Sequence, residues 1–73
     1  MKVKELIEYL QTLDSELMVV YPGYEGGYED VNVFEIRGLC LKVHPEWYYG
    51  DHDEPESYGV PEGLPTVQCL IIH

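Results

Sequence analysis

The first fifteen residues have the spacing of an amphipathic helix. Apolar side chains recur every third or fourth position and would share one face of a helix; they are Val3, Leu6, Ile7, Leu10 and Leu13. Asp14 and Ser15 follow with side chains that favour a turn. We therefore predict an N-terminal helix that ends at this turn and packs through its apolar face.

Four later segments have the composition of strands, at 17–21, 31–36, 39–43 and 66–72. Pro22-Gly23 closes the first, and Arg37-Gly38 predicts a turn between the second and third. The last is apolar on both faces, which predicts a central position in a sheet. This order predicts an α+β fold, in which the helix packs on a small antiparallel sheet of about four strands.

A glycine-rich stretch, PGYEGGYED at 22–30, precedes the second predicted strand. A phosphate-binding loop would need a lysine and a following helix, and this stretch has neither. Two interpretations remain. It forms a wide hairpin in which glycines supply positive φ angles, or it is a recognition loop in which Tyr24 and Tyr28 offer broad contact surfaces.

A second irregular stretch, 44–65, separates the last two predicted strands. It carries six acidic residues and no Lys or Arg, and its four prolines and three glycines exclude a long helix. It also holds Trp47, Tyr48, Tyr49 and Tyr58. Long loops in compact domains are usually functional or disordered, and here the aromatic residues favour a function.

The whole chain has 73 residues, which predicts a single domain, 1–73, with a small core. Fourteen acidic residues against four basic ones give a formal net charge of −10. Contacts to nucleic-acid phosphates draw on Lys and Arg, so direct binding of nucleic acid is disfavoured, as is an anionic membrane. The natural complements are cations and basic protein surfaces.

Cys40 and Cys69 lie within apolar runs, so we interpret them as small buried hydrophobes rather than as a disulfide. No apolar run approaches the roughly 20 residues of a membrane span, and the acidic N-terminal segment does not resemble a signal peptide. These features favour a reduced, cytoplasmic setting.

One cluster raises the question of a metal. His44 precedes the run Asp51, His52, Asp53 and Glu54, and imidazole and carboxylate groups together can hold a divalent cation. On an extended chain the two aspartates would converge while the histidine between them points away. No spaced ligand signature is present, so a solvated acidic loop is the other interpretation.

Enzymatic chemistry finds no support in the sequence. No motif surrounds Ser15 or Ser57, the cysteines have the setting of core residues, and carboxylates are too numerous to single out a pair for acid–base work. We therefore predict a protein that is not an enzyme, with no catalytic residues and no cofactor.

Three strings carry a resemblance: VKELIEYL at 3–10, GYEGGY at 23–28 and WYYG at 47–50. With them, most of the chain resembles small proteins of unknown function encoded by bacteriophages and prophages. The second string is the most specific. The resemblance implies an accessory phage protein that acts in the bacterial cytoplasm, where small acidic phage proteins often inhibit host defence or nucleic-acid enzymes.

Together these features give a hypothesis: a non-enzymatic binding protein whose acidic, aromatic face, formed by 21–30 and 44–65, engages a basic surface of a host protein. It would imitate the charge pattern of nucleic acid and block a nucleic-acid or defence-system site. The expected contact residues are Tyr24, Glu25, Tyr28, Trp47, Tyr48, Tyr49, Asp51, Asp53 and Glu54. Two alternatives remain open, namely a loop 44–65 that closes over a small ligand or metal, and a homodimer that buries the aromatic loop.

Overall fold

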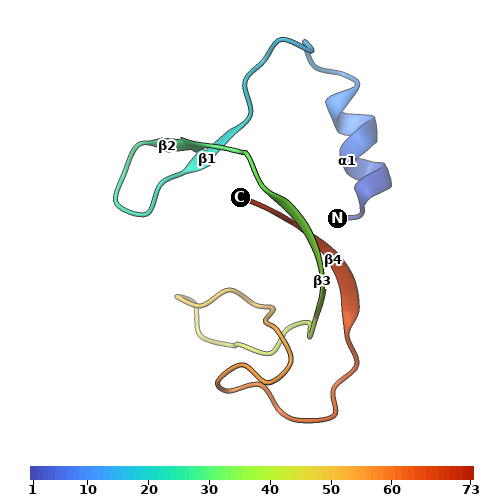
Figure 1. The fold of residues 1–73 in the computed structure, drawn as a ribbon, viewed down its shortest axis with the longest axis vertical. Coiled ribbons are helices and arrows are strands. Elements are labelled where there is room, and N and C mark those ends of the chain that lie inside the picture. The colour runs from blue at the N-terminus through green and yellow to red at the C-terminus, as the bar shows by residue number, and fades with distance from the viewer. The chain divides into compact units, whose positions relative to one another are not determined.

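One helix and four strands make up the secondary structure in a computed structural model that describes all residues 1–73 (Figure 1). In chain order they are α1 (Val3–Leu10), β1 (Val20–Pro22), β2 (Tyr28–Asp30), β3 (Phe34–Leu39) and β4 (Val67–Ile72). The strands pair as two antiparallel sheets of two, β1 with β2 and β3 with β4. The α+β class is confirmed, with the four strands divided between two sheets.

The chain separates into two compact units. The first comprises residues 1–33 with 72–73, and contains α1 and the β1–β2 sheet. The second comprises residues 34–71, and contains β3, most of β4 and the long irregular segment between them.

The helix α1 is shorter than the apolar spacing predicts. The backbone N–H groups of Thr12 and Leu13 donate to carbonyls three residues earlier. This is the tighter 3₁₀ pattern, and it ends the α-helix. The Thr12 hydroxyl also donates to the Tyr9 carbonyl at 2.7 Å. The predicted turn residue Asp14 does act as one, because its side chain accepts the Glu16 N–H at 2.9 Å.

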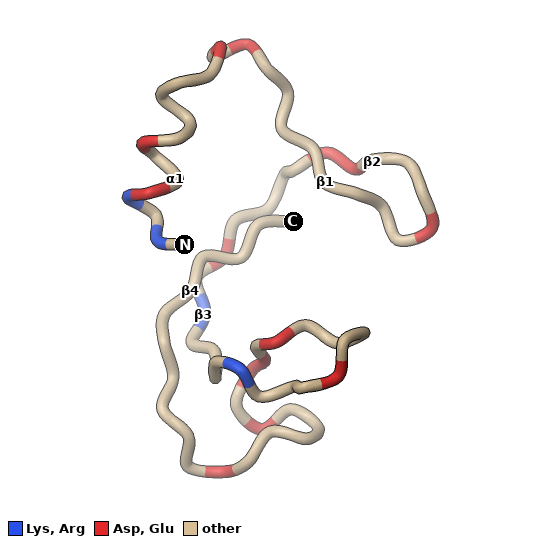
Figure 2. The backbone as a smooth tube through the Cα atoms, turned by 180° about the vertical axis from the view of Figure 1, so that it is seen from behind, with Lys and Arg blue, Asp and Glu red and all other residues tan.

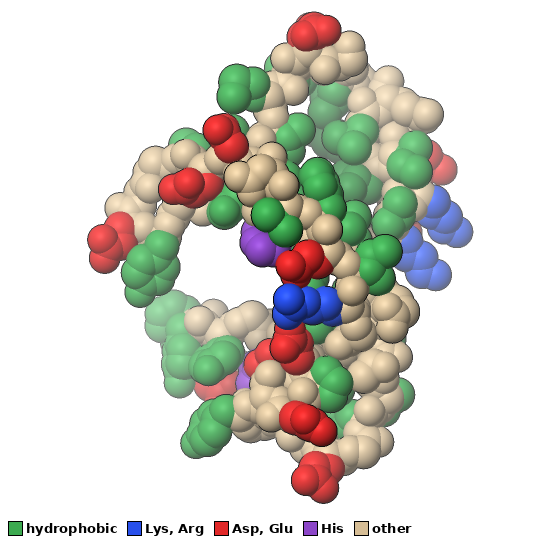
Figure 3. All heavy atoms as spheres, viewed as in Figure 1, with side chains coloured by type: hydrophobic (Ala, Val, Ile, Leu, Met, Phe, Trp, Pro, Cys, Tyr) green, Lys and Arg blue, Asp and Glu red, His purple; other side chains and the backbone are tan.

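Burial of apolar side chains is slight. No residue of α1 is buried, and Cys40 is the one hydrophobic residue that is buried in the whole chain. Hydrophobic side chains accordingly appear widely on the visible face of the molecule (Figure 3). Exposed apolar area of this kind is typical of surfaces that bind another protein or a second copy of the chain.

The glycine-rich stretch forms the predicted hairpin. Val20 faces Asp30 and Pro22 faces Tyr28 across the antiparallel pair. At the tip, Gly26 and Gly27 have φ angles of 122° and 67°, which residues with a side chain rarely adopt. Strand β1 begins at Val20, later than the predicted start at residue 17, and it includes Pro22, which an edge strand tolerates.

The second sheet corrects three predictions. The predicted turn at Arg37-Gly38 lies inside β3, and the predicted strand 39–43 is not formed beyond Leu39. A side chain at Gly38 would come within 3.3 Å of the Thr66 side chain, so this glycine serves close cross-strand packing rather than a turn. β4 pairs with β3 alone and is therefore an edge strand, not a central one.

The predicted strand 31–36 is interrupted. Residues 31–33 lie between β2 and β3, where the N–H groups of Asn32 and Val33 both donate to the His73 carbonyl, at 3.0 and 2.7 Å. The His73 N–H donates back to Val33 at 3.0 Å. The last residue of the chain thus pairs with residues 32–33 inside the first unit.

Candidate functional site

A single backbone bridge closes the long irregular segment of the second unit into a loop. Cys40 and Asp53 exchange two N–H···O=C hydrogen bonds, at 2.8 and 3.1 Å, in antiparallel pairing. Cys40 is 2% exposed, which confirms it as a small buried hydrophobe, whereas Cys69 is only half-buried, and both cysteines are free thiols. The Val43 N–H adds a further bond to the Asp51 carbonyl at 2.7 Å. Residues 41–52 thereby form a closed loop.

The buried polar group of this loop is His44, which is 9% exposed. Its Nε2 lies 2.8 Å from Asp53 Oδ2, and because a carboxylate only accepts, Nε2–H is the donor. The other oxygen of Asp53 accepts the Glu54 N–H at 2.8 Å. The hydrogen bond from His44, followed by that from Glu54, lowers the pKa of Asp53. The carboxylate is thus kept ionised and committed to the loop.

Aromatic rings extend outward from His44. The imidazole lies against the Tyr49 ring with centroids 4.5 Å apart, and Tyr49 in turn neighbours Tyr48 at 6.1 Å. Tyr48 meets Trp47 edge-on at 5.6 Å. A turn in which the Tyr49 N–H donates to the Glu46 carbonyl brings these consecutive rings together. The series runs from a buried imidazole to an indole that is 93% exposed.

A pocket of about 230 Å³ opens beside these rings. Its lining includes His44, Glu46, Tyr48, Tyr49, Tyr58 and Gly59. His44 is the most buried of them, whereas Tyr58 stands at the rim with 93% of its surface exposed. Neither Lys nor Arg lines the pocket. The concavity is therefore aromatic and carries one carboxylate without a neutralising cation.

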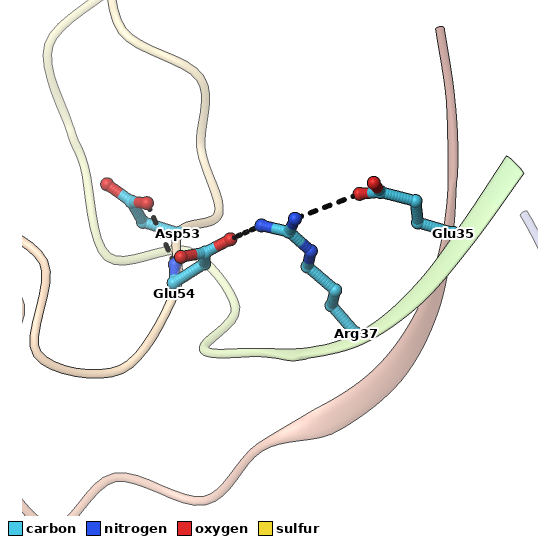
Figure 4. Close-up of polar contacts among 4 residues, drawn as sticks. All are labelled: Glu35, Arg37, Asp53 and Glu54. Atoms are coloured by element: carbon cyan, nitrogen blue, oxygen red, sulfur yellow. Dashed lines mark hydrogen bonds and ion pairs between the residues drawn. The ribbon is translucent and has the colours of Figure 1, made fainter. Parts of the chain in front are cut away.

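An ion-pair network joins the loop to the neighbouring strand. Arg37 on β3 places its guanidinium between Glu54 and Glu35, with Nη1 on Glu54 and Nη2 3.0 Å from Glu35 (Figure 4). The hydrogen bond with Glu54 and the negative charges of both glutamates raise the pKa of Arg37. The sequence pattern missed this role because it placed Arg37 in a turn. Arg37 is one of only four basic residues among fourteen acidic ones, and this scarcity indicates that it would pair with a carboxylate.

The predicted contact residues divide between the two units. Trp47, Tyr48 and Tyr49 are exposed on the second unit, and Tyr24 and Tyr28 are exposed on the hairpin of the first. Each set is therefore considered as a surface of its own unit.

The predicted acidic contact residues also differ in their roles. Asp53 and Glu54 are half-buried and make the internal bonds described above. Glu25 and Asp51 are exposed, and Asp51 enters the loop closure through its backbone carbonyl alone. Acidic positions recur along the backbone of segment 44–65 (Figure 2). Only some of them are thus free to meet a partner.

The residues that raised the question of a metal do not converge on one point. His44 does reach Asp53, but His52 turns to accept the Lys42 N–H at 2.9 Å. No group of three His, Cys, Asp or Glu side chains is arranged to hold a metal ion. The histidines serve the closure of the loop.

Comparison with known proteins returns no relatives. No protein-family model matches the chain, and no curated protein or solved structure matches it.

The one helix, α1, has eight residues, and no helix is long and apolar enough to cross a membrane.

Proposed function

We propose that segment 44–65 is a docking surface that binds a basic surface of a host protein, without catalysis. One observation carries the proposal. Trp47 and Tyr58 are each 93% exposed, within a segment that has six acidic residues and no Lys or Arg. Large aromatic side chains that bind through both apolar area and polar edges dominate many protein interfaces.

The free charge of the segment agrees with this role. Asp53 and Glu54 are held internally, whereas the exposed carboxylates of Glu46, Asp51, Glu56 and Glu62 point to no partner within the chain. Exposed charge of one sign accelerates the encounter with a surface of the opposite sign. A groove that binds nucleic acid is such a surface, and the protein would block it.

From the resemblance to phage proteins, we further propose that this function is exercised in the cytoplasm of a bacterial host. In this setting the partner is a host defence protein or a nucleic-acid enzyme with an exposed basic groove. The protein competes with DNA or RNA for that groove rather than binding nucleic acid itself.

Affinity capture from a bacterial lysate tests the proposal with three baits: the natural chain, Trp47→Ala and Tyr9→Ala. Tyr9 is an exposed ring on α1, outside the docking surface, so Tyr9→Ala is the matched control. We expect a basic nucleic-acid-binding protein on the natural and Tyr9→Ala baits only. Added DNA should displace that protein.

Salt provides the second criterion. Screening shortens the reach of exposed charges from about 10 Å at 0.1 M to about 3 Å at 1 M salt. The captured protein should therefore elute as salt rises. Arg37→Gln, which removes one positive charge and the ion pair with Glu54, should strengthen capture at low salt only. Retention that is indifferent to both salt and Trp47→Ala refutes the docking surface.

A second candidate, self-association, is favoured by a separate observation. Cys40 is the one buried hydrophobic residue, and Ile7 and Leu10 on the apolar face of α1 are both exposed. Small domains with slight cores often gain stability from a second copy. Size-exclusion chromatography with light scattering should then show a dimer that Ile7→Ser dissociates. A strict monomer at high concentration rules out this candidate.

A further inference from the structure

The geometry points to an arginine side chain of the partner as the occupant of the pocket beside His44. This inference rests on the proposed docking function, which it refines from a basic surface to one recognised group. Three tyrosines and Glu46 line the pocket, and no cation does. Aromatic faces attract cations through the negative potential of their π-systems. A single carboxylate among such rings therefore favours a positively charged ligand.

The size of the pocket suits one side chain. Pockets that hold drug-sized ligands occupy about 300–1,000 Å³. The pocket described here has about 230 Å³ and is open at the rim, where Tyr58 is almost fully exposed. A side chain that enters from a docked protein would fit this volume, with its backbone remaining outside.

Guanidinium matches the groups in the pocket better than ammonium does. It is planar, stacks on aromatic faces, is weakly hydrated and presents several N–H donors in a fork that suits a carboxylate. Glu46 supplies that carboxylate. Stacking on Tyr48 or Tyr49 and bonding to Glu46 would use both properties of an arginine at once.

His44 also lines the pocket. Because Nε2–H donates to Asp53, the imidazole in its neutral form has Nδ1 as its acceptor. A methyl group at Gly59, which also lines the pocket, would lie 3.6 Å from His44 Cε1 and 4.0 Å from Nδ1. This edge of the imidazole is thus directed to the glycine side of the pocket. Asp53 acts here as a positioning residue, since it orients the imidazole through the opposite nitrogen.

A titration followed by NMR of the backbone amides tests the assignment. The probes are N-acetyl-arginine-N-methylamide and its lysine and citrulline counterparts, of which citrulline keeps the shape of arginine without the charge. We expect saturable shifts centred on Tyr48, Tyr49 and Gly59 with the arginine probe. The lysine probe should bind more weakly, and the citrulline probe should cause no saturable shift.

Two variants locate the interaction. Tyr58→Leu removes a ring at the exposed rim and should weaken the arginine probe about two- to fivefold, the range for an exposed cation–π contact. Glu46→Gln should weaken it further. Tyr24→Leu and Glu25→Gln, which make the same changes on the hairpin of the first unit, are the matched controls and should change nothing.

Three results overturn the assignment: equal binding of the citrulline probe, equal or tighter binding of the lysine probe, and shifts that remain unchanged in Tyr58→Leu and Glu46→Gln. Failure here is separable from failure of the docking function. If salt-sensitive capture of a basic host protein persists in both variants, the docking surface stands and the arginine pocket is refuted. If the arginine probe binds as expected and no basic protein is captured, the pocket binds arginine but the docking function is refuted.

Discussion

Replacing His44 by alanine should loosen the closed loop at its buried centre. The substitution removes the hydrogen bond to Asp53 and the contact with Tyr49, in which the ring centroids lie 4.5 Å apart. His44 lies early in the loop, and both of these partners lie later in the sequence, so the imidazole links the two halves of the loop. Without the imidazole, the loop is held by backbone bonds, namely the bridge between Cys40 and Asp53 and the bond from the Val43 N–H to the Asp51 carbonyl, and by the Lys42–His52 contact.

The magnitude follows from the ring contact. A pair of aromatic rings at this separation contributes about 0.5–1.5 kcal/mol beyond its buried area. Since 1.4 kcal/mol corresponds to a factor of ten, the opening equilibrium of the loop should rise at least about two- to tenfold. The lost hydrogen bond adds to this figure, so the ring contact sets a lower limit.

Hydrogen exchange of the Cys40 amide measures this opening directly. Its N–H donates to the Asp53 carbonyl at 2.8 Å beneath a fully buried side chain, so exchange requires the bridge to open. His52→Ala is the matched control in the same loop. His52 is exposed and accepts only the Lys42 N–H, which water can replace.

The reasoning predicts that Cys40 exchange accelerates in His44→Ala and stays near the natural rate in His52→Ala. Equal rates in the two variants would refute the view that the buried imidazole stabilises the loop. So would an acceleration confined to His52→Ala. The rest of the amide spectrum should remain in place in both proteins.

Two further predictions concern acid and the hairpin. The pKa of Asp53 is lowered first by the hydrogen bond from His44, so its contribution to loop stability is complete above the ordinary pKa of about 3.9 and is lost as pH falls through the lowered folded value. An NMR titration should show this pKa rising toward its ordinary range in His44→Ala, while the hydrogen bond from the Glu54 N–H still lowers it. An unchanged titration would contradict the assignment. Gly23→Ala would place a methyl group 2.5 Å from the Gly26 carbonyl oxygen, and should abolish the cross-strand contacts of the hairpin in NMR spectra. Gly50→Ala meets no atom within 4 Å and should leave the β3–β4 sheet and the loop unchanged, so equal damage from both substitutions would argue against steric control of the hairpin.

The local elements could be predicted from the sequence because their causes are local. Apolar spacing predicts the helix at the N-terminus, and the paired glycines predict the hairpin, since Gly26 and Gly27 supply φ angles that other residues avoid. The composition of 44–65 likewise predicts an irregular segment, and the structure has neither helix nor strand there. These features depend only on neighbours a few residues away.

The strand boundaries were predicted less well because they depend on partners distant in sequence. The Arg37-Gly38 pair is typical of a turn, yet Gly38 lies within β3. The Thr66 side chain lies close to its backbone there. The apolar run of β4 signals a central strand, yet only β3 pairs with it. A residue's own propensity cannot report which strand will lie beside it.

The sequence by itself determined that the chain is strongly acidic, that its aromatic residues concentrate in two irregular stretches, and that Cys40 belongs among the buried residues. Only the tertiary structure decided which carboxylates are free: Asp53 is taken by His44 and Glu54 by Arg37, while Glu46 is left beside the rings of a pocket. The physical reason is that composition sets the total charge, whereas loop closure sets the distances between charges. Electrostatic and hydrogen-bond energies depend on those distances.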